Sequence, residues 1–276
     1  MSSLRTSLTS DFFSLPLPRA IAHRGDGGEF PENTLISFRA AADAGAAYFE
    51  LDVHMTRDGE IVVCHDENLL RTCGRDAAIR ETTWKEIASA DAGSGFSIDG
   101  ANFPFRGRGV GVPRLADVFG AFPGVRIVVE IKHTAPSLVR RLLEVIDRAA
   151  ARRLVMIASE HQGPIDEVRV LAPGLPTNLP RGEIAELLQA MAARKEGYHP
   201  RGDAVQIPPE YEGWKLATGE TVEFAHRAGL EVHVWTVNEE AEMRRLLDLG
   251  VDGIISDYPA RLLAVVRSLA PGRRAE

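Results

Sequence analysis

The sequence predicts a (β/α)8 barrel, a TIM barrel in which parallel strands alternate with helices. Short runs rich in β-branched residues alternate with amphipathic stretches from residue 20 almost to the C-terminus. Regular alternation of this kind, with right-handed crossovers, implies a parallel sheet. The chain has 276 residues, and eight strand–helix units usually take about 250 residues. We therefore expect a single barrel domain.

Nine segments have the composition of a strand, which is one more than the barrel needs. Asp58-Gly59 lies between two of them, and an Asp-Gly pair in this position predicts a tight hairpin. The segment Ile61–Cys64 is therefore expected to fold back beside the preceding strand and to stay outside the barrel. In order, the nine segments are Ala20–His23, Tyr48–Val53, Ile61–Cys64, Arg126–Ile131, Leu154–Ala158, Pro176–Leu179, Ala204–Ile207, Glu231–Val237 and Gly253–Ser256.

Helical periodicity fills the intervals between these strands, and several helices carry end signals. Asn33 is a suitable N-cap for the first helix, and Gly45, Gly229 and Gly250 are placed to end helices. The clearest helical stretches are 34–44, 137–151, 182–195, 218–228 and 239–249.

Four ranges describe the expected domain organisation. Residues 1–18 form an N-terminal arm, either disordered or packed, without the continuous apolar stretch of a signal peptide. Residues 19–270 form the barrel domain. Within it, residues 66–125 are an insertion that is too long for a simple βα loop. In a barrel such an insertion would sit over the catalytic mouth as a lid or small subdomain. The polar tail 271–276 is expected to be disordered.

The composition argues against two classes of protein. A net charge of -7 disfavours general nucleic-acid binding, which needs a basic face. No apolar run approaches the roughly 18 residues of a membrane span, so we expect no stable membrane insertion. Cys64 and Cys73 are too few for a disulfide framework and suit a reducing compartment. We therefore expect a cytoplasmic protein.

Carboxylates gather at the ends of two predicted strands. Glu50 and Asp52 point to the same side because strand side chains alternate, and so do Glu130 and Lys132. In a barrel, such positions line the active site. Three carboxylates suit one divalent metal ion, Mg²⁺ or Ca²⁺, and zinc less well, since no tight His/Cys spacing is present. The alternative is that Glu50 and Asp52 form buried ion pairs with Arg24 and Lys132.

Two histidines end strand-like runs near these carboxylates. His23 closes the first run and His65 closes the hairpin. Either one alone could be a structural histidine, but together they suggest an acid–base pair. Cleavage of a phosphodiester needs a base for the attacking oxygen and an acid for the departing one, and histidine can fill both roles. Arg24 and Lys132 could neutralise the phosphate, or could simply pair with the carboxylates.

Three other residues receive weaker interpretations. His54 shares the face of the strand carboxylates but lies toward the hairpin turn, so we expect it to be exposed. Trp235 ends a predicted strand and is a candidate for an apolar wall of the pocket, although tryptophan more often belongs to the core. Cys64 has no convincing base partner, so we interpret it as structural.

In this order and spacing, these segments resemble the glycerophosphodiester phosphodiesterase family, and the resemblance runs nearly from end to end. The matching segments are His23-Arg24-Gly25, Pro31-Glu32-Asn33-Thr34, Glu50-Leu51-Asp52-Val53, Asp58-Gly59, Val63-Cys64-His65-Asp66, Leu70-Arg71-Thr72, Asp91-Ala92-Gly93, Val129-Glu130-Ile131-Lys132, Val234-Trp235-Thr236-Val237-Asn238 and Gly253-Ile254-Ile255-Ser256-Asp257-Tyr258-Pro259.

The resemblance implies a distorted TIM barrel that hydrolyses small glycerophosphodiesters, such as glycerophosphocholine, to sn-glycerol 3-phosphate and an alcohol. A substrate hydroxyl could attack first and give a cyclic phosphate that water then opens. His23 would be the general acid and His65 the base, or the reverse. The other implied roles are a divalent metal ion on Glu50, Asp52 and Glu130, and phosphate binding by Arg24 and Lys132.

Two alternatives are open. Proteins of the same fold act on lipids, so lysophospholipase D-like or sphingomyelinase D-like cleavage of a lipid phosphodiester is the second interpretation. A non-catalytic barrel that binds phosphodiesters is the third, and it is disfavoured because every acid, base and ligand position is filled. The sequence makes no prediction of the preferred alcohol or of the oligomeric state.

Overall fold

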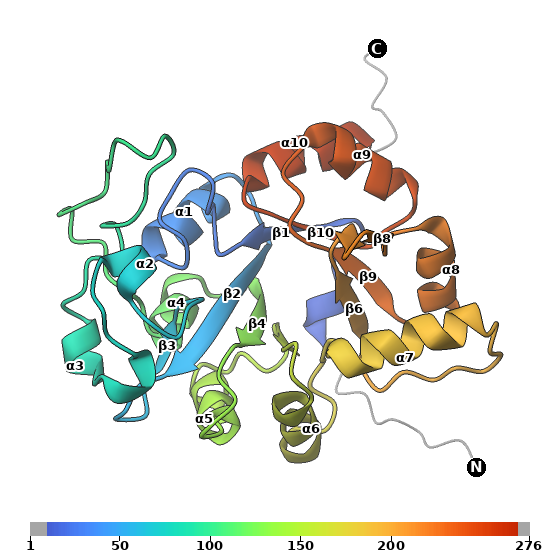
Figure 1. The fold of residues 1–276 in the computed structure, drawn as a ribbon, viewed down its shortest axis with the longest axis horizontal. Coiled ribbons are helices and arrows are strands. Elements are labelled where there is room, and N and C mark those ends of the chain that lie inside the picture. Colours follow the sequence, from blue (N-terminus) through green and yellow to red (C-terminus); the bar gives the residue numbers. More distant parts are fainter. Residues whose placement is uncertain (1–9, 270–276) are drawn as a thin grey trace.

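The structure is a computed structural model that describes residues 10–269. Parallel strands curl around a common axis, with helices on the outside (Figure 1). The strands of the main sheet are β1 (Arg19–His23), β2 (Tyr48–Met55), β3 (Ile61–Val63), β4 (Arg126–Ile131), β5 (Val155–Ala158), β6 (Ala204–Ile207), β9 (Glu231–Val234) and β10 (Gly253–Ser256).

The order of the strands is that of a barrel. Neighbouring strands follow the path β5-β4-β2-β1-β10-β9-β6, and every pair along it is parallel. Between the two ends of this path, Thr177 and Asn178 form single parallel bridges to Ile157 of β5 and Ala204 of β6. The predicted TIM barrel is confirmed. Its eighth position is taken by two isolated bridges, so the predicted strand Pro176–Leu179 is wrong as a continuous strand.

The predicted hairpin is also confirmed. β3 pairs antiparallel with β2, with Val53 opposite Val63, and lies outside the barrel path. A second hairpin, β7 (Glu210–Tyr211) and β8 (Trp214–Lys215), follows β6 and forms a separate small sheet.

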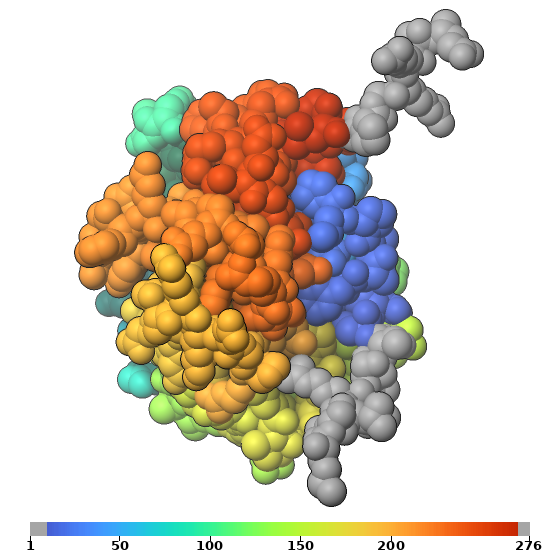
Figure 2. All heavy atoms as spheres, turned by 90° about the vertical axis from the view of Figure 1, so that its right-hand side faces the viewer, coloured from blue at the N-terminus to red at the C-terminus, as the bar shows by residue number. Residues whose placement is uncertain are grey.

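The part of the chain that the structure describes has ten α-helices, most of them on the outside of the sheet, while α2 and α3 lie to one side in the segment between β3 and α4 (Figure 1). On one side of the molecule α7 and α8 lie next to each other (Figure 2). The helices are α1 (Leu35–Asp43), α2 (Leu70–Cys73), α3 (Trp84–Ile87), α4 (Leu115–Ala121), α5 (Val139–Arg148), α6 (Gln162–Leu171), α7 (Arg181–Ala192), α8 (Gly219–Arg227), α9 (Glu240–Asp248) and α10 (Pro259–Leu269). None of them is long and apolar enough to cross a membrane.

Helix ends follow the sequence signals with one exception. Gly45, Gly229 and Gly250 come directly after the C-caps of α1, α8 and α9 and have positive φ angles, as predicted. Asn33 does not cap α1. Thr34 is the N-cap, and its hydroxyl accepts a hydrogen bond from the Ser37 amide. The side chain of Asn33 turns toward β2 instead.

Residues 10–15 close the N-terminal end of the barrel. Phe12 is fully buried, and Tyr48 donates a hydrogen bond of 2.7 Å to its carbonyl oxygen. Beside it, the buried guanidinium of Arg19 forms two hydrogen bonds with Glu231, of 2.7 and 2.6 Å. The opposite, C-terminal ends of the strands are therefore available for a site. Residues 1–9 of the expected arm and the tail 271–276 lie outside the described residues.

The segment between β3 and α4 has a small core of its own. Cys64, Cys73, Ile79 and Val112 belong to this cluster, whereas Leu115 and the rest of α4 pack into the main core with β2 and β4. Both cysteines are buried and unpaired, and burial raises the pKa of Cys64 to about 12. A thiol with so high a pKa is a poor nucleophile.

Candidate active site

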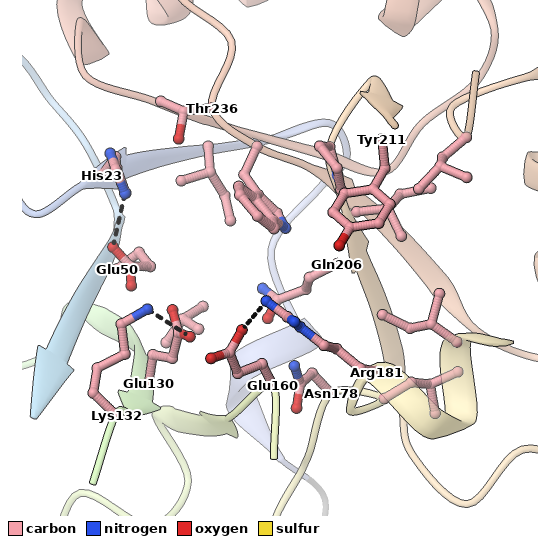
Figure 3. Close-up of a pocket in the computed structure, with 18 of the residues that line it drawn as sticks. His23, Glu50, Glu130, Lys132, Glu160, Asn178, Arg181, Gln206, Tyr211 and Thr236 are labelled. Carbon is pink, nitrogen blue, oxygen red and sulfur yellow. Dashed lines mark hydrogen bonds and ion pairs between the residues drawn. The ribbon is translucent and has the colours of Figure 1, made fainter. Parts of the chain in front are cut away.

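A cavity of about 480 Å³ opens at the C-terminal ends of the barrel strands (Figure 3). This is the edge at which TIM-barrel enzymes carry their catalytic residues. Asp52 is buried behind the lining, in contact with it. The predicted site residues that line the cavity directly are His23, Arg24, Glu50, His65, Glu130, Lys132 and Trp235.

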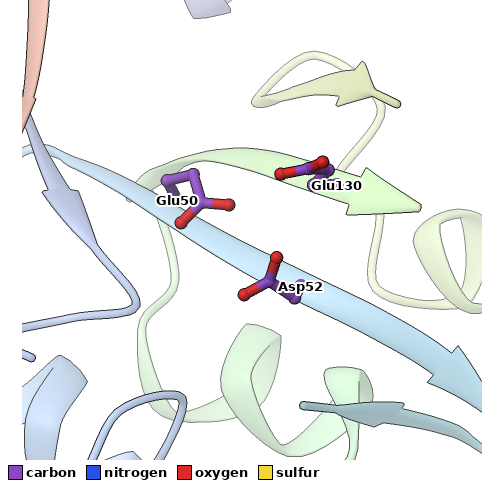
Figure 4. A group of neighbouring side chains, drawn as sticks. All are labelled: Glu50, Asp52 and Glu130. Carbon is purple, nitrogen blue, oxygen red and sulfur yellow. The ribbon is translucent and has the colours of Figure 1, made fainter. Parts of the chain in front are cut away.

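Three carboxylates on β2 and β4 lie close together (Figure 4), and two of them, Glu50 and Glu130, line this cavity. Glu50 and Asp52 lie two residues apart on β2 and so face the same way, and Glu130 lies directly opposite Asp52 on β4. One oxygen from each of the three carboxylates lies within 4.8 Å of the others. Strand pairing thus brings together acidic groups that are distant in sequence.

Two basic side chains compensate this negative charge in part. Arg24 Nε lies 3.0 Å from Asp52 Oδ2, and Lys132 Nζ lies 3.6 Å from Asp52 Oδ1. Lys132 also donates a hydrogen bond of 3.0 Å to Glu130. The ion pairs that formed the alternative interpretation are therefore present for Asp52. Within residues 10–269, by contrast, Glu50 accepts a side-chain hydrogen bond only from the Arg24 amide, at 3.3 Å, and it lies 3.8 Å from His23 Nε2.

The surroundings of the three carboxylates shift their pKa values in different directions. Burial, together with the charges of Asp52 and Glu130, raises the pKa of Glu50 well above its ordinary value. Burial also raises the pKa of Glu130. At Asp52 burial acts in the same direction, but Arg24 and Lys132 outweigh it and lower the pKa. Three acidic groups facing two cations leave an excess of negative charge at this point.

The acidic cluster fits a divalent cation. Asp52 Oδ1 is buried and has no hydrogen-bond partner among the described residues, while Oδ2 of the same carboxylate accepts a bond of 2.9 Å from Asn33. A buried carboxylate oxygen without a partner is costly unless something compensates it. Oxygen ligands from three carboxylates are the donors that Mg²⁺ and Ca²⁺ prefer. Glu50, Asp52 and Glu130 could therefore hold such an ion.

An aspartate contacts His23 at Nδ1, the ring nitrogen that does not face the cavity. Its Nδ1 lies 2.6 Å from Asp257 Oδ1 at the end of β10, and Asn238 donates a hydrogen bond of 2.7 Å to the other oxygen of Asp257. Burial opposes ionisation of Asp257, but His23, Asn238 and Arg24 together outweigh it and lower the pKa of this carboxyl. An ionised carboxylate can only accept, so the proton sits on Nδ1 and Nε2 faces Glu50 and the cavity.

His65 also contacts an aspartate through its Nδ1 atom. Its Nδ1 lies 2.7 Å from Oδ1 of the next residue, Asp66. Arg71 of α2 donates to both oxygens of Asp66, at 2.7 and 3.1 Å, and to both oxygens of Glu32, at 2.8 and 2.7 Å. Although burial acts against it, bonding to Arg71 and His65 lowers the pKa of Asp66 to about 2. The inserted segment thereby supports the second histidine.

The loop after β1 places Arg24 at the cavity. Arg24 has a positive φ of 54°, its amide donates to the Glu50 carbonyl at 2.9 Å, and its Nη1 donates to Glu32 at 3.0 Å. This backbone turn directs the guanidinium back over β2. Lys132 reaches the same place from the end of β4, so both cations predicted for phosphate binding lie beside the carboxylates.

Two of the remaining sequence interpretations can be compared with the structure. The prediction that His54 is exposed is wrong, because this side chain is 3% exposed and its Nε2 contacts the His65 carbonyl oxygen at 3.0 Å. β2 runs to Met55, so His54 still lies within the sheet, where it pairs with Val62 of β3 in the hairpin. Trp235 lines the cavity and is 43% exposed, so it lies outside the core.

Sequence reasoning did not assign roles to the partners of the two histidines. Asp257, Asn238, Asp66 and Arg71 all lie in segments on which the family resemblance rested, but only the folded barrel shows what they contact. Asp66 could have been suspected from its place next to His65. Asp257 could not, because its contact with His23 depends on the pairing of the first and last strands.

Comparison with known proteins decides the family. A sequence profile of the glycerophosphoryl diester phosphodiesterase family matches residues 23–261, which is most of the chain and includes all the site residues described above. The chain belongs to this family. As a member, it is a phosphodiesterase enzyme.

Individual relatives of this family member carry related names. It is 33% identical over 244 residues to a probable glycerophosphodiester phosphodiesterase 2 of Mycobacterium tuberculosis, covering 86% of each chain. It is 27% identical to lysophospholipase D GDPD1 of Mus musculus, covering 89% of this chain and 85% of the relative.

Among solved structures, this phosphodiesterase resembles one from Oleispira antarctica that was determined in complex with the product sn-glycerol-3-phosphate. The TM-score is 0.75 and the identity is 25%, and the match covers 91% of this chain and 97% of the other.

Proposed function

We propose that this family member hydrolyses glycerophosphodiesters to sn-glycerol 3-phosphate and an alcohol, with a divalent metal ion and a pair of histidines. One observation carries the proposal: His23 and His65, each backed by an aspartate at Nδ1, line the same cavity as the Glu50 and Glu130 carboxylates. The named activities of its relatives are consistent with this reaction.

The histidines would exchange protons with the substrate. Because Asp257 and Asp66 fix the Nδ1 proton, Nε2 of each ring is the atom that can accept or donate on the cavity side. His23 is the proposed acid for the departing oxygen and His65 the proposed base for the attacking one, and the reversed assignment has the same geometry. Arg24 and Lys132, beside them, would bind the phosphate oxygens.

Glu50, Asp52 and Glu130 would hold the metal ion, Mg²⁺ or Ca²⁺. The excess negative charge of the cluster supports this, and so does Asp52 Oδ1, which is buried without a hydrogen bond among the described residues and has Lys132 Nζ at 3.6 Å. When bound, a divalent ion stabilises charge on the phosphate and lowers the pKa of the attacking oxygen. Lys132 lies between Asp52 and Glu130 and offsets part of the repulsion between these two carboxylates.

The attacking oxygen is either water or a hydroxyl of the substrate glycerol. Attack by the hydroxyl would first form a cyclic phosphate, which water then opens. Following the reaction by ³¹P NMR distinguishes the two routes. A transient cyclic phosphate supports attack by the hydroxyl, whereas single-step incorporation of ¹⁸O from water with no intermediate supports direct hydrolysis.

The test of the function is release of sn-glycerol 3-phosphate from a panel of glycerophosphodiesters, with and without EDTA and added metal. Release that is lost with EDTA and restored by metal supports both the reaction and the carboxylate site. Failure to release product from every soluble diester, with metal present, would move lysophospholipase D-like or sphingomyelinase D-like cleavage of a lipid to first place.

We also propose that the enzyme works in a reducing compartment such as the cytoplasm. Cys64 and Cys73 are both unpaired thiols, as is usual in cytoplasmic proteins. Cell fractionation of the source organism tests this location directly.

A further inference from the structure

The backbone holds the two histidines of the proposed acid–base pair in different ways. His23 is the last residue of β1, and it pairs with Glu50 in the parallel ladder between β1 and β2. His65 comes after the end of β3. Beyond β3 the Cys64 amide still donates a hydrogen bond of 3.0 Å to the Asp52 carbonyl oxygen, but His65 is not part of the strand pairing. The sheet therefore fixes the backbone of His23 and not that of His65.

A side chain of β2 contacts the backbone of His65 beyond this ladder. His54 Nε2 lies 3.0 Å from the His65 carbonyl oxygen. A carbonyl oxygen can only accept a hydrogen bond, so Nε2 of His54 carries a proton and donates it. Within residues 10–269 this carbonyl oxygen accepts no other hydrogen bond. The bond from His54 thus takes the place of the missing ladder bond.

His54 is itself firmly placed. It lies within β2 opposite Val62 of β3, and it is only 3% exposed. Its ring packs edge-on against the ring of His133, with the ring centres 6.0 Å apart and the planes at 79°. A hydrogen bond that is shielded from water is stronger than one on the surface. The bond to His65 therefore ties a segment outside the strands to the rigid part of the sheet.

The contacts of the His65 imidazole with the inserted segment are less shielded. Its Nδ1 lies 2.7 Å from Asp66, and Asp66 in turn lies 2.7 Å from Arg71. The side chains of Asp66 and Arg71 are 28% and 49% exposed, and ion pairs that water can reach contribute little. These contacts set the rotation of the ring, whereas His54 restrains the backbone from which the ring projects.

We propose that His54 is a positioning residue for His65. Its bond to the carbonyl oxygen keeps the imidazole at the place from which Nε2 can exchange a proton with the substrate. The inference rests on the proposed function, because the position of His65 affects the rate only if this ring takes part in proton transfer. A shift of about 1 Å in a reacting group can cost roughly 100-fold in rate, so loss of the restraint should lower kcat.

Two substitutions of His54 separate the hydrogen bond from the packing of the ring. His54→Phe keeps a ring against His133 but cannot donate, whereas His54→Gln can donate through its amide nitrogen. We expect His54→Phe to lower kcat for glycerophosphodiester hydrolysis about 10- to 100-fold. KM should stay unchanged, because Arg24 and Lys132 are untouched. His54→Gln should recover most of the lost kcat. Full kcat in His54→Phe, or an equal loss in His54→Gln, would refute the proposal.

His133→Phe is the matched control. It makes the same substitution in the other ring of the pair, at a residue 8% exposed whose Nε2 has no hydrogen-bond partner among the described residues. This variant should keep the kcat of the wild type. An equal fall in His54→Phe and His133→Phe would assign the effect to packing and overturn the proposal.

Metal binding excludes a further cause, since His54 lies two residues from Asp52. Calorimetric titration of His54→Phe with Mg²⁺ should give the affinity of the wild type. Weaker binding that accompanies the fall in kcat would place the effect at the carboxylates and would overturn the role of His54 toward His65.

A measurement on the wild type tests the hydrogen bond without a buried substitution. The imidazole ¹⁵N signals of His54 are identified by their absence from the spectrum of His54→Gln. We expect a proton on Nε2 at neutral pH, and an Nε2 without a proton would refute the bond. If the wild type cleaves no glycerophosphodiester, the proposed function fails and the role of His54 falls with it. If the wild type is active and His54→Phe equals it, only the role of His54 is refuted.

Discussion

Asp257 lies 2.6 Å from Nδ1 of His23, although 234 positions separate the two residues in the chain. They meet because β1 and β10 are neighbours in the barrel, with Ala22 opposite Ser256. The last strand therefore determines how the histidine of the first strand is oriented.

Replacing Asp257 tests this contact. Asp257→Asn keeps the shape of the side chain but allows an amide to donate where the carboxylate accepted, so the Nδ1 proton of His23 is no longer fixed. We expect kcat to fall roughly 10²- to 10⁴-fold, with little change in KM and an altered pH–rate profile. Asp248→Asn, at the end of α9, is the control. A pH–rate profile identical to that of the wild type would show that Asp257 does not act through His23.

The two histidines should be needed for turnover and not for the fold. In His23→Asn and His65→Asn we expect kcat to fall roughly 10²- to 10⁴-fold, because one proton transfer loses its catalyst. Circular dichroism and metal binding should stay as in the wild type. His199→Asn, at an exposed position after α7, should retain full activity. Full turnover in either active-site variant would contradict the acid–base assignment.

Metal affinity should depend on the three carboxylates. Glu130→Gln removes one charged oxygen ligand, so calorimetric titration with Mg²⁺ and with Ca²⁺ should show at least about tenfold weaker binding. The thermal stabilisation that metal gives to the wild type should shrink accordingly. Glu196→Gln, in an exposed turn, serves as the control. Equal affinity in Glu130→Gln and the control would place the ion elsewhere.

Acidic pH should destabilise the N-terminal end of the barrel, where Arg19 and Glu231 form their ion pair. Burial acts against ionisation of Glu231, but bonding to Arg19 and His233 lowers its pKa from 4.5 to about 2. A carboxylate with a depressed pKa stabilises the fold above its unfolded pKa and loses that contribution as the pH falls toward the folded one. The contribution is on the order of 3 kcal/mol at pH 7 and should disappear between about pH 4.5 and pH 2.

Urea unfolding of the wild type and of Glu231→Gln at several pH values checks this. The variant leaves the buried Arg19 without a counter-charge, so it should be less stable at pH 7 and less sensitive to acid. Glu223→Gln, from an exposed ion pair on α8, should match the wild type. The same acid sensitivity in wild type and Glu231→Gln would show that this pair does not govern acid unfolding.

Local sequence patterns predicted the barrel because its signals are short-range. Alternating strand and helix periods, the Asp58-Gly59 turn and the glycines after helices each act within a few residues. The errors came where the outcome depends on neighbours in space. Asn33 has the chemistry of a cap, yet its amide bonds to Asp52 on the adjacent strand. His54 was expected near an exposed turn, but it is buried within β2, where it pairs with Val62 and contacts the His65 carbonyl oxygen.

In the candidate site, too, features set by local sequence could be predicted and features set by neighbours in space could not. Glu50 and Asp52 share a strand, so their common direction follows from the alternation of side chains. The place of Glu130 opposite Asp52 required the pairing of β2 with β4, which the sequence implied only through the fold class. The apolar part of the cavity lining was represented in the sequence only by Trp235, because its other side chains, such as Ile184, Ile207 and Leu216, come from separate segments of the chain.

Arg71 bonds to Glu32 in the loop after β1 and to Asp66 beside His65, and this limits how the enzyme can be engineered. The segment between β3 and α4 is not an exchangeable cassette. A chimera that took residues 67–112 from another protein would lose the arginine that holds the partner of His65, unless the donor carried one in the same place. Loop grafts aimed at new substrates should therefore transfer Glu32, Asp66 and this segment as one unit.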